Sequence, residues 1–173
     1  MELNNLVKAA IFSALAIGLG YAFLFVPNIE FMTVIIFISG LSLGVKTGML
    51  VGGTSMFIFS AMNPIGSGLV FPPLLIGQVL SMIIIGMIGG LLNRLFDSNN
   101  HLRFRIILAG LCGLGCALLY DIITTIAYPI SVGYGFKQTI GYAISGILFT
   151  FIHQVSNIII FSIVIPKYLQ ISS

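Results

Sequence analysis

The chain has 173 residues, of which 58% are hydrophobic and only 6% are charged. Soluble domains carry roughly a quarter charged residues, so this composition excludes an ordinary water-soluble protein. The net charge of +3 comes from lysines and arginines dispersed along the chain, which argues against a nucleic-acid-binding patch and favours contact with anionic lipid headgroups.

Apolar segments separated by turn-forming residues fill almost the whole sequence. They predict an all-α integral membrane protein with a single six-helix domain over residues 1–173. The second and third segments are about 15 residues long, short against the ~20 residues of an ordinary membrane-crossing helix, so neighbouring helices would have to shield them. The expected helices cover residues 6–26, 29–43, 47–62, 73–96, 105–128 and 138–165, and the last two stop before Pro129 and Pro166.

Basic residues are distributed unevenly over this topology. Lysine and arginine collect in cytoplasmic connections because positive charge resists translocation. Only Lys137 falls on the opposite side from the other six, so both termini are expected in the cytoplasm. The loops at 27–28, 63–72 and 129–137 then face outwards. The six basic residues on the cytoplasmic side are Lys8, Lys46, Arg94, Arg103, Arg105 and Lys167.

The first predicted helix carries a stripe of small residues. Ala10, Ala14 and Gly18 follow one another at a spacing of four and therefore lie on one face. Such a stripe allows another helix to approach closely. Either a partner protein or the chain's own helices could pack on it.

Polar residues at the outer ends of the next segments are candidate ligand contacts. Asn28 and Glu30 flank the start of the second helix, where Glu30 could alternatively compensate the positive helix end. Asn63 opens the loop 63–72, which is rich in turn formers yet apolar, and is therefore expected to fold over the molecule as a lid. Gln78 lies about one and a half turns inside the fourth helix.

Asp121 is the most costly residue to bury, because a carboxylate inside a membrane must be paired or hydrated. Thr124, Thr125 and Tyr128 share its helix face, and Tyr120 lies at the edge of this strip. Two interpretations stay open. The strip contacts a ligand, or it forms a hydrogen-bond network between helices.

The last predicted helix offers a second polar strip. Tyr142 and Ser145 lie on one face, and His153 continues it at greater depth. Counting turns places His153 roughly three turns from Asp121 in depth, which argues against a catalytic pair. A lone buried histidine is more often a hydrogen-bonded core residue than a ligand contact. Lys137, just before this strip, could meet an anionic group or extend towards water.

Motifs for catalysis, nucleotide binding and metal binding are absent from the sequence. Cys112 and Cys116 have a spacing of four but stand among glycines with no further ligand nearby, so we expect them to be packing residues. The chain is therefore expected to be non-catalytic, with no cofactor and no metal. Energy for any uphill transport would have to come from an ion gradient or from another subunit.

At this point the chain resembles the substrate-binding S component of an energy-coupling factor (ECF) vitamin transporter. The resemblance covers the size, the helix number and the short second and third helices. Its sharpest parts are the AxxxA motif from Ala10 to Ala14 and the block 30–92, with its hairpin at 43–48 and Pro72-Pro73. The absence of tryptophan is a departure, because many members stack a vitamin on one.

The resemblance implies a non-enzymatic subunit in a bacterial or archaeal cytoplasmic membrane that captures a vitamin or precursor from outside. Its implied partners are a transmembrane coupling subunit, docked at Ala10, Ala14 and Gly18, and two cytoplasmic ATPases. A membrane scaffold of the cell-wall machinery and an intramembrane enzyme are the alternatives. The implied substrate contacts are Asn28, Asn63, Gln78, Asp121, Thr125, Tyr128, Lys137 and Tyr142, followed by Glu30, Tyr120, Thr124, Ser145 and His153.

Overall fold

The computed structural model describes residues 3–96 and 101–172, and within these ranges every regular element is a helix. The all-α class is thereby confirmed. The α-helices are α1 (Leu3–Ala22), α2 (Met32–Leu43), α3 (Val45–Ala61), α4 (Pro72–Leu91), α5 (Leu102–Val132), α6 (Phe136–Ser145) and α7 (Ile147–Ser172). Two short 3-10 helices, η1 (Gly68–Val70) and η2 (Asn93–Phe96), flank α4.

Four of the described helices, α1, α4, α5 and α7, are long and apolar enough to cross a membrane. Helix α2 is equally apolar but has only 12 residues. It is buried on all sides from Met32 to Leu41, as expected for a helix without a polar face. Surrounding protein therefore shields the short helix. Six membrane crossings and the orientation of the termini stay predictions.

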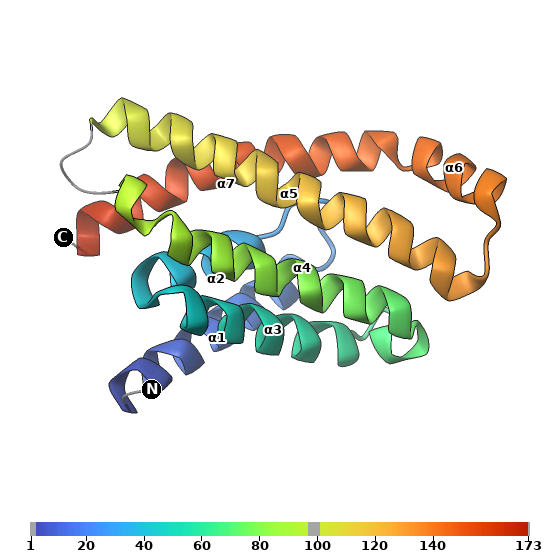
Figure 1. Ribbon diagram of the computed structural model, residues 1–173, viewed down its shortest axis with the longest axis horizontal. Helices are drawn as coiled ribbons and strands as arrows, with labels where there is room; N and C mark the ends of the chain where they lie inside the picture. The colour runs from blue at the N-terminus through green and yellow to red at the C-terminus, as the bar shows by residue number, and fades with distance from the viewer. Residues whose placement is uncertain (1–2, 97–100, 173) are drawn as a thin grey trace.

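The helices pack into an elongated bundle with the closest contacts between α3 and α4 and between α5 and α7 (Figure 1). Both described chain ends, the α2–α3 hairpin and the start of α5 lie at one end of the bundle, and α6 lies at the other. The segments that carry six of the seven basic residues therefore meet at one end. This arrangement agrees with the charge pattern of the sequence.

Glycines allow α2, α3 and α4 to touch backbone to backbone. A Cβ atom added at Gly40 or Gly48 would overlap the carbonyl oxygen of Gly86, and one added at Gly86 would overlap that of Gly48. The close approach places the three helices nearer to one another than side chains would permit. These helices form a rigid support beside the cavity described below.

The last two predicted helices differ from those in the structure. Helix α5 continues through Pro129 to Val132 and ends at Gly133, whose φ of 72° is left-handed. Helix α7 continues through Pro166 in the same way. Membrane helices tolerate proline where neighbouring groups satisfy the freed backbone. The expected single helix 138–165 is instead divided at Gly146 into α6 and α7.

Candidate ligand-binding pocket

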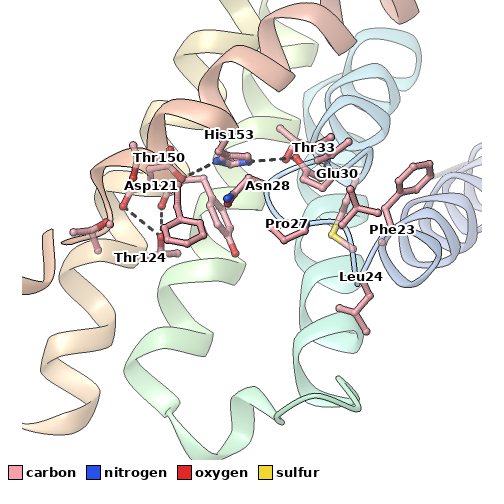
Figure 2. A pocket seen from close by; sticks show the side chains of 18 of the residues that line it. Phe23, Leu24, Pro27, Asn28, Glu30, Thr33, Asp121, Thr124, Thr150 and His153 are labelled. Atoms are coloured by element: carbon pink, nitrogen blue, oxygen red, sulfur yellow. Dashed lines mark hydrogen bonds and ion pairs between the residues drawn. The ribbon is translucent and has the colours of Figure 1, made fainter. Parts of the chain in front are cut away.

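A cavity of about 580 Å³ lies where the α1–α2 connection approaches α5 and the α6–α7 junction. Apolar side chains contributed by the α1–α2 connection, α2, α3, α4, α6 and α7 line part of it. Polar groups converge on the remainder (Figure 2). The polar lining residues are Asn28, Glu30, Thr33, Tyr120, Asp121, Thr124, Thr125, Tyr142, Ser145, Thr150 and His153.

Residues 23–31, which we call the α1–α2 connection, are fastened across the bundle to α7. The hydroxyl group of Ser156 donates to the carbonyl oxygen of Asn28 at 2.6 Å. Asn28 has a φ of 60°, a left-handed conformation that asparagine adopts more readily than most residues. This conformation turns the chain so that Glu30 faces the cavity beside His153.

Three ionisable side chains meet at the cavity wall. Nδ1 of His153 lies 2.8 Å from Oδ1 of Asp121, and Nε2 of His153 lies 3.7 Å from Oε1 of Glu30. Figure 2 shows the imidazole ring between the two carboxylates. We call Glu30, His153 and Asp121 the acidic triad. It joins the α1–α2 connection, α5 and α7 at one point.

The separation of Asp121 and His153 predicted from the sequence is therefore wrong. The turn count assumed a single helix over 138–165, but α7 begins only at Ile147, so His153 lies fewer than two turns from the start of its helix. Helix α5 also extends past the expected end at residue 128, which places Asp121 about three turns from its end. Both corrections bring Asp121 and His153 to the same depth along the bundle.

The ring of His153 fits the triad best as an imidazolium ion. An imidazolium donates from both nitrogens, whereas a neutral ring would turn a lone pair towards one carboxylate. With both carboxylates ionised and the ring protonated, the triad carries one net negative charge. No other charged side chain of the described residues lines the cavity, so this charge is uncompensated there.

Glu30 has two roles, since it also caps α2. Its Oε2 atom accepts a hydrogen bond of 2.9 Å from the backbone N–H group of Thr33. Glu30 thus compensates the N-terminus of a helix, which was the alternative role expected from the sequence. It also contacts His153. Burial alone would raise the pKa of Glu30, but His153 and Thr33 outweigh burial and hold this pKa below its ordinary value.

One oxygen of each carboxylate in the triad is buried and has no hydrogen-bond partner within the described structure. These atoms are Oε1 of Glu30 and Oδ2 of Asp121. An unsatisfied buried acceptor costs roughly 1–3 kcal/mol, and more when it is charged. Both carboxylates therefore keep hydrogen-bonding capacity that the protein does not use, although Oε1 of Glu30 also faces Nε2 of His153 at 3.7 Å.

Tyr120 and Gln78 connect the cavity to its glycine-packed support. Ser60 donates to Oε1 of Gln78 at 2.7 Å, and Gln78 is also hydrogen-bonded to the side chain of Tyr120. Gln78 does not itself line the cavity. We therefore assign it to positioning Tyr120, which lines the cavity and lies edge-on to His153 with ring centroids 6.0 Å apart.

Three further predicted contacts lie away from the cavity lining. Asn63 accepts a hydrogen bond from the backbone of Ile65 and closes a turn. Tyr128 stacks on Tyr142, with ring centroids 5.1 Å apart, and so touches a lining residue without lining the cavity itself. Lys137 is exposed on α6.

The loop 63–72 also does not act as the expected lid in this structure. None of its residues lines the cavity. Gly68 packs on Ser60, and Phe71 packs on Tyr128 with ring centroids 5.9 Å apart. These contacts account for Phe71, whereas Ile65, Leu69 and Val70 are exposed. The α1–α2 connection lines the cavity instead.

The remaining predicted contacts line the cavity together. They are Asn28, Asp121, Thr125 and Tyr142 from the main set and Glu30, Tyr120, Thr124, Ser145 and His153 from the second set. Sequence reasoning missed Thr33, Thr150 and the apolar lining. Thr150 was detectable, because it lies three residues before His153 and shares its helix face. The apolar residues carry no signal that separates them from the core.

The small-residue stripe of α1 faces away from the rest of the described structure. Ala10, Ala14 and Gly18 are all exposed, and a Cβ atom added at Gly18 would meet nothing within 4 Å. The buried face of α1 is formed by other small residues, Ala9, Ala16 and Gly20. Packing against the chain's own helices therefore does not account for the stripe.

The described residues contain no cluster of three His, Cys, Asp or Glu side chains that could hold a metal ion. Cys112 and Cys116 are both free, and Cys116 is buried. Comparison of the chain with protein-family models, with curated proteins and with solved structures found no match in any of the three.

Proposed function

We propose that the chain is the substrate-binding S component of an ECF-type transporter, which captures a vitamin or vitamin precursor outside a bacterial or archaeal cytoplasmic membrane. The observation that carries the proposal is the cavity of about 580 Å³ with its converging polar groups. Its size falls within the range of small-molecule sites, and its mixed apolar and polar lining is typical of them.

The exposed stripe of α1 supports the same proposal. A helix face of Ala10, Ala14 and Gly18 offers a flat surface to a second protein, and close helix packing in membranes uses such surfaces. The proposed partner is a transmembrane coupling subunit driven by two cytoplasmic ATPases. In this arrangement both termini are cytoplasmic and the cavity opens outwards.

The proposed cycle uses three parts of the chain. The cavity takes up the substrate between the α1–α2 connection and α7, and the loosely packed α6 moves over its open side. Helix α6 suits this motion because none of its residues is buried and Gly146 separates it from α7. The loaded protein then docks through α1, and ATP hydrolysis on the partners releases the substrate inside.

An intramembrane enzyme is the second candidate. It requires convergent ionisable groups at one depth, and the contact of 2.8 Å between His153 and Asp121 meets that requirement. A scaffold is less favoured, because it does not require a cavity on which polar groups converge.

Native mass spectrometry of the tagged protein, expressed at its natural level and gently solubilised, tests the proposal. We expect the masses of a coupling subunit and two ATPases, together with a small ligand released on activation. Recovery with cell-wall enzymes alone would favour the scaffold. Recovery of a chemically altered ligand, formed with time from the one supplied, would favour the enzyme.

A further inference from the structure

We propose that the cavity selects an organic cation that donates N–H hydrogen bonds to Glu30 and Asp121. This inference rests on the proposed function and names the class of substrate. The ligand would carry one positive charge on an amine, an amidinium or a protonated ring nitrogen. Its apolar body would occupy the remainder of the cavity.

The charge of the cavity wall is the first reason. The acidic triad carries one net negative charge, and no other charged described residue lines the cavity to compensate it. Lys137, the cation closest along the chain to the lining part of α6, is exposed and outside the lining. A ligand with one positive charge neutralises the cavity, whereas an anion would add repulsion in a region of low dielectric constant.

The unused acceptors are the second reason. Oε1 of Glu30 and Oδ2 of Asp121 are buried without a hydrogen-bond partner, while the opposite oxygen of each carboxylate is hydrogen-bonded. Oδ2 of Asp121 is left for a donor, and Oε1 of Glu30 has only the longer ion-pair contact of 3.7 Å with Nε2 of His153. Charge alone would not use these atoms, so the cation must carry N–H groups.

The apolar lining is the third reason, because it separates an organic cation from an inorganic one. A hydrated metal ion needs several oxygen ligands in a shell, and the described residues offer no cluster that could hold one. Aromatic and thioether side chains suit the body of an organic molecule and attract positive charge. The lining includes Phe23, Met32, Met56, Phe59, Met82 and Phe149.

Benzamidine, benzamide and benzoate are suitable probes, because they share one shape and differ in charge and donors. Binding to the purified full-length protein in detergent would be measured by ligand-observed NMR and by thermal shift. We expect benzamidine to bind at least about tenfold more tightly than benzamide, since a hydrogen bond to a charged group is worth at least that factor. Benzoate should bind most weakly.

Variants then locate the selectivity. Glu30→Gln and Asp121→Asn preserve side-chain shape and should each remove most of the preference for benzamidine over benzamide. Lys137→Gln removes a charge outside the lining and should leave the preference unchanged. Because each ratio compares two probes on one protein sample, partial loss of folded protein does not affect it, and the wild-type comparison stands without any variant.

The inference is overturned if benzamide or benzoate binds as tightly as benzamidine, if benzamidine does not bind at millimolar concentration, or if both carboxylate variants keep the full preference. The two proposals fail separately. Lack of benzamidine selectivity in a protein that copurifies with ATPases rejects only the substrate class. Selective binding by a protein that never associates with ATPases rejects only the transporter.

Discussion

His153 and Asp121 lie 32 positions apart in the sequence, yet their side chains meet at 2.8 Å between α7 and α5. The same histidine reaches Glu30 from its other ring nitrogen. One imidazole ring therefore connects three segments of the chain. Removing His153 from this group leaves two carboxylates without a cation, whereas removing either carboxylate leaves one ion pair.

His153→Ala should destabilise the protein strongly, because it leaves two carboxylates facing each other. Removing one partner of a buried ion pair lowers the unfolding free energy by roughly 3–5 kcal/mol. Chemical unfolding in detergent measures the loss. The matched control is His101→Ala, since His101 is the second histidine of the chain and is exposed. Equal unfolding free energies of the two variants would mean that the triad makes no net contribution to the stability of the protein.

The double variant His153→Ala with Asp121→Ala tests whether the two residues act as a pair. Because the second change removes a charge that the first left unpaired, we expect a coupling free energy on the order of 1–3 kcal/mol between them. A complete double-mutant cycle of unfolding free energies gives this value. Simple additivity would contradict the contact.

Gly86→Ala should unfold or misassemble the support formed by α2, α3 and α4. Its new Cβ atom would overlap the carbonyl oxygen of Gly48, which is backbone and cannot rotate away. Overpacking of this kind costs about 2–3 kcal/mol or more. At Gly115, also helical, a Cβ atom would meet nothing within 4 Å. Gly115→Ala should therefore be neutral or stabilise by up to about 1 kcal/mol, and melting temperatures would rank the two variants.

Acidification should remove the contribution of Glu30 to stability. The pKa of Glu30 in the folded protein lies below its ordinary value of 4.5, so the stabilisation is complete above pH 4.5 and is lost as pH falls through the folded value. The difference in melting temperature between the wild type and Glu30→Gln should shrink over that range. If the difference in melting temperature widened on acidification, the pKa of Glu30 in the folded protein would be raised rather than lowered. Lys137→Gln should follow the wild type throughout.

Ala14→Trp should abolish uptake of the natural substrate while leaving ligand binding unchanged. The indole ring would project from the exposed stripe and block close approach of a second helix. Uptake by cells and binding to purified protein are measured in parallel, and Ala10→Trp should behave alike. Ile107→Trp, at an exposed position on α5, is the control and should transport normally. Full uptake by both alanine variants would reject the stripe as a docking surface.

Local signals in the sequence predicted much of the helical organisation. Proline, glycine and polar residues located the connections that precede α6 but not the break between α6 and α7. The strip from Asp121 to Thr125 was recognised from helical spacing alone. The cost of burying Asp121 also pointed to the cavity wall. These properties depend on neighbours a few residues apart, which is why a single sequence carries them.

The depth of each polar residue in the bundle, and the residues that it contacts, could not be predicted in the same way. The break at Gly146 and the passage of α5 through Pro129 depend on packing against other helices, and together they decide that His153 meets Asp121. Asn63 and Lys137 have the right chemistry for a site but lie outside the cavity lining. The entry of Glu30 into the cavity depends on the left-handed turn at Asn28, for which asparagine is only a weak local signal.

The α1–α2 connection has one further consequence. It comes directly after α1, the helix that bears the exposed stripe. The backbone of Asn28 is hydrogen-bonded to α7, and Glu30 of the same segment lines the cavity. In the proposed transporter, a ligand that shifts this connection would change the free energy of docking at α1, and by thermodynamic reciprocity a docked partner would change the affinity for ligand by the same factor. The ligand-bound and ligand-free proteins would then differ in their affinity for a partner at α1. Residues 23–31 would couple the two sites.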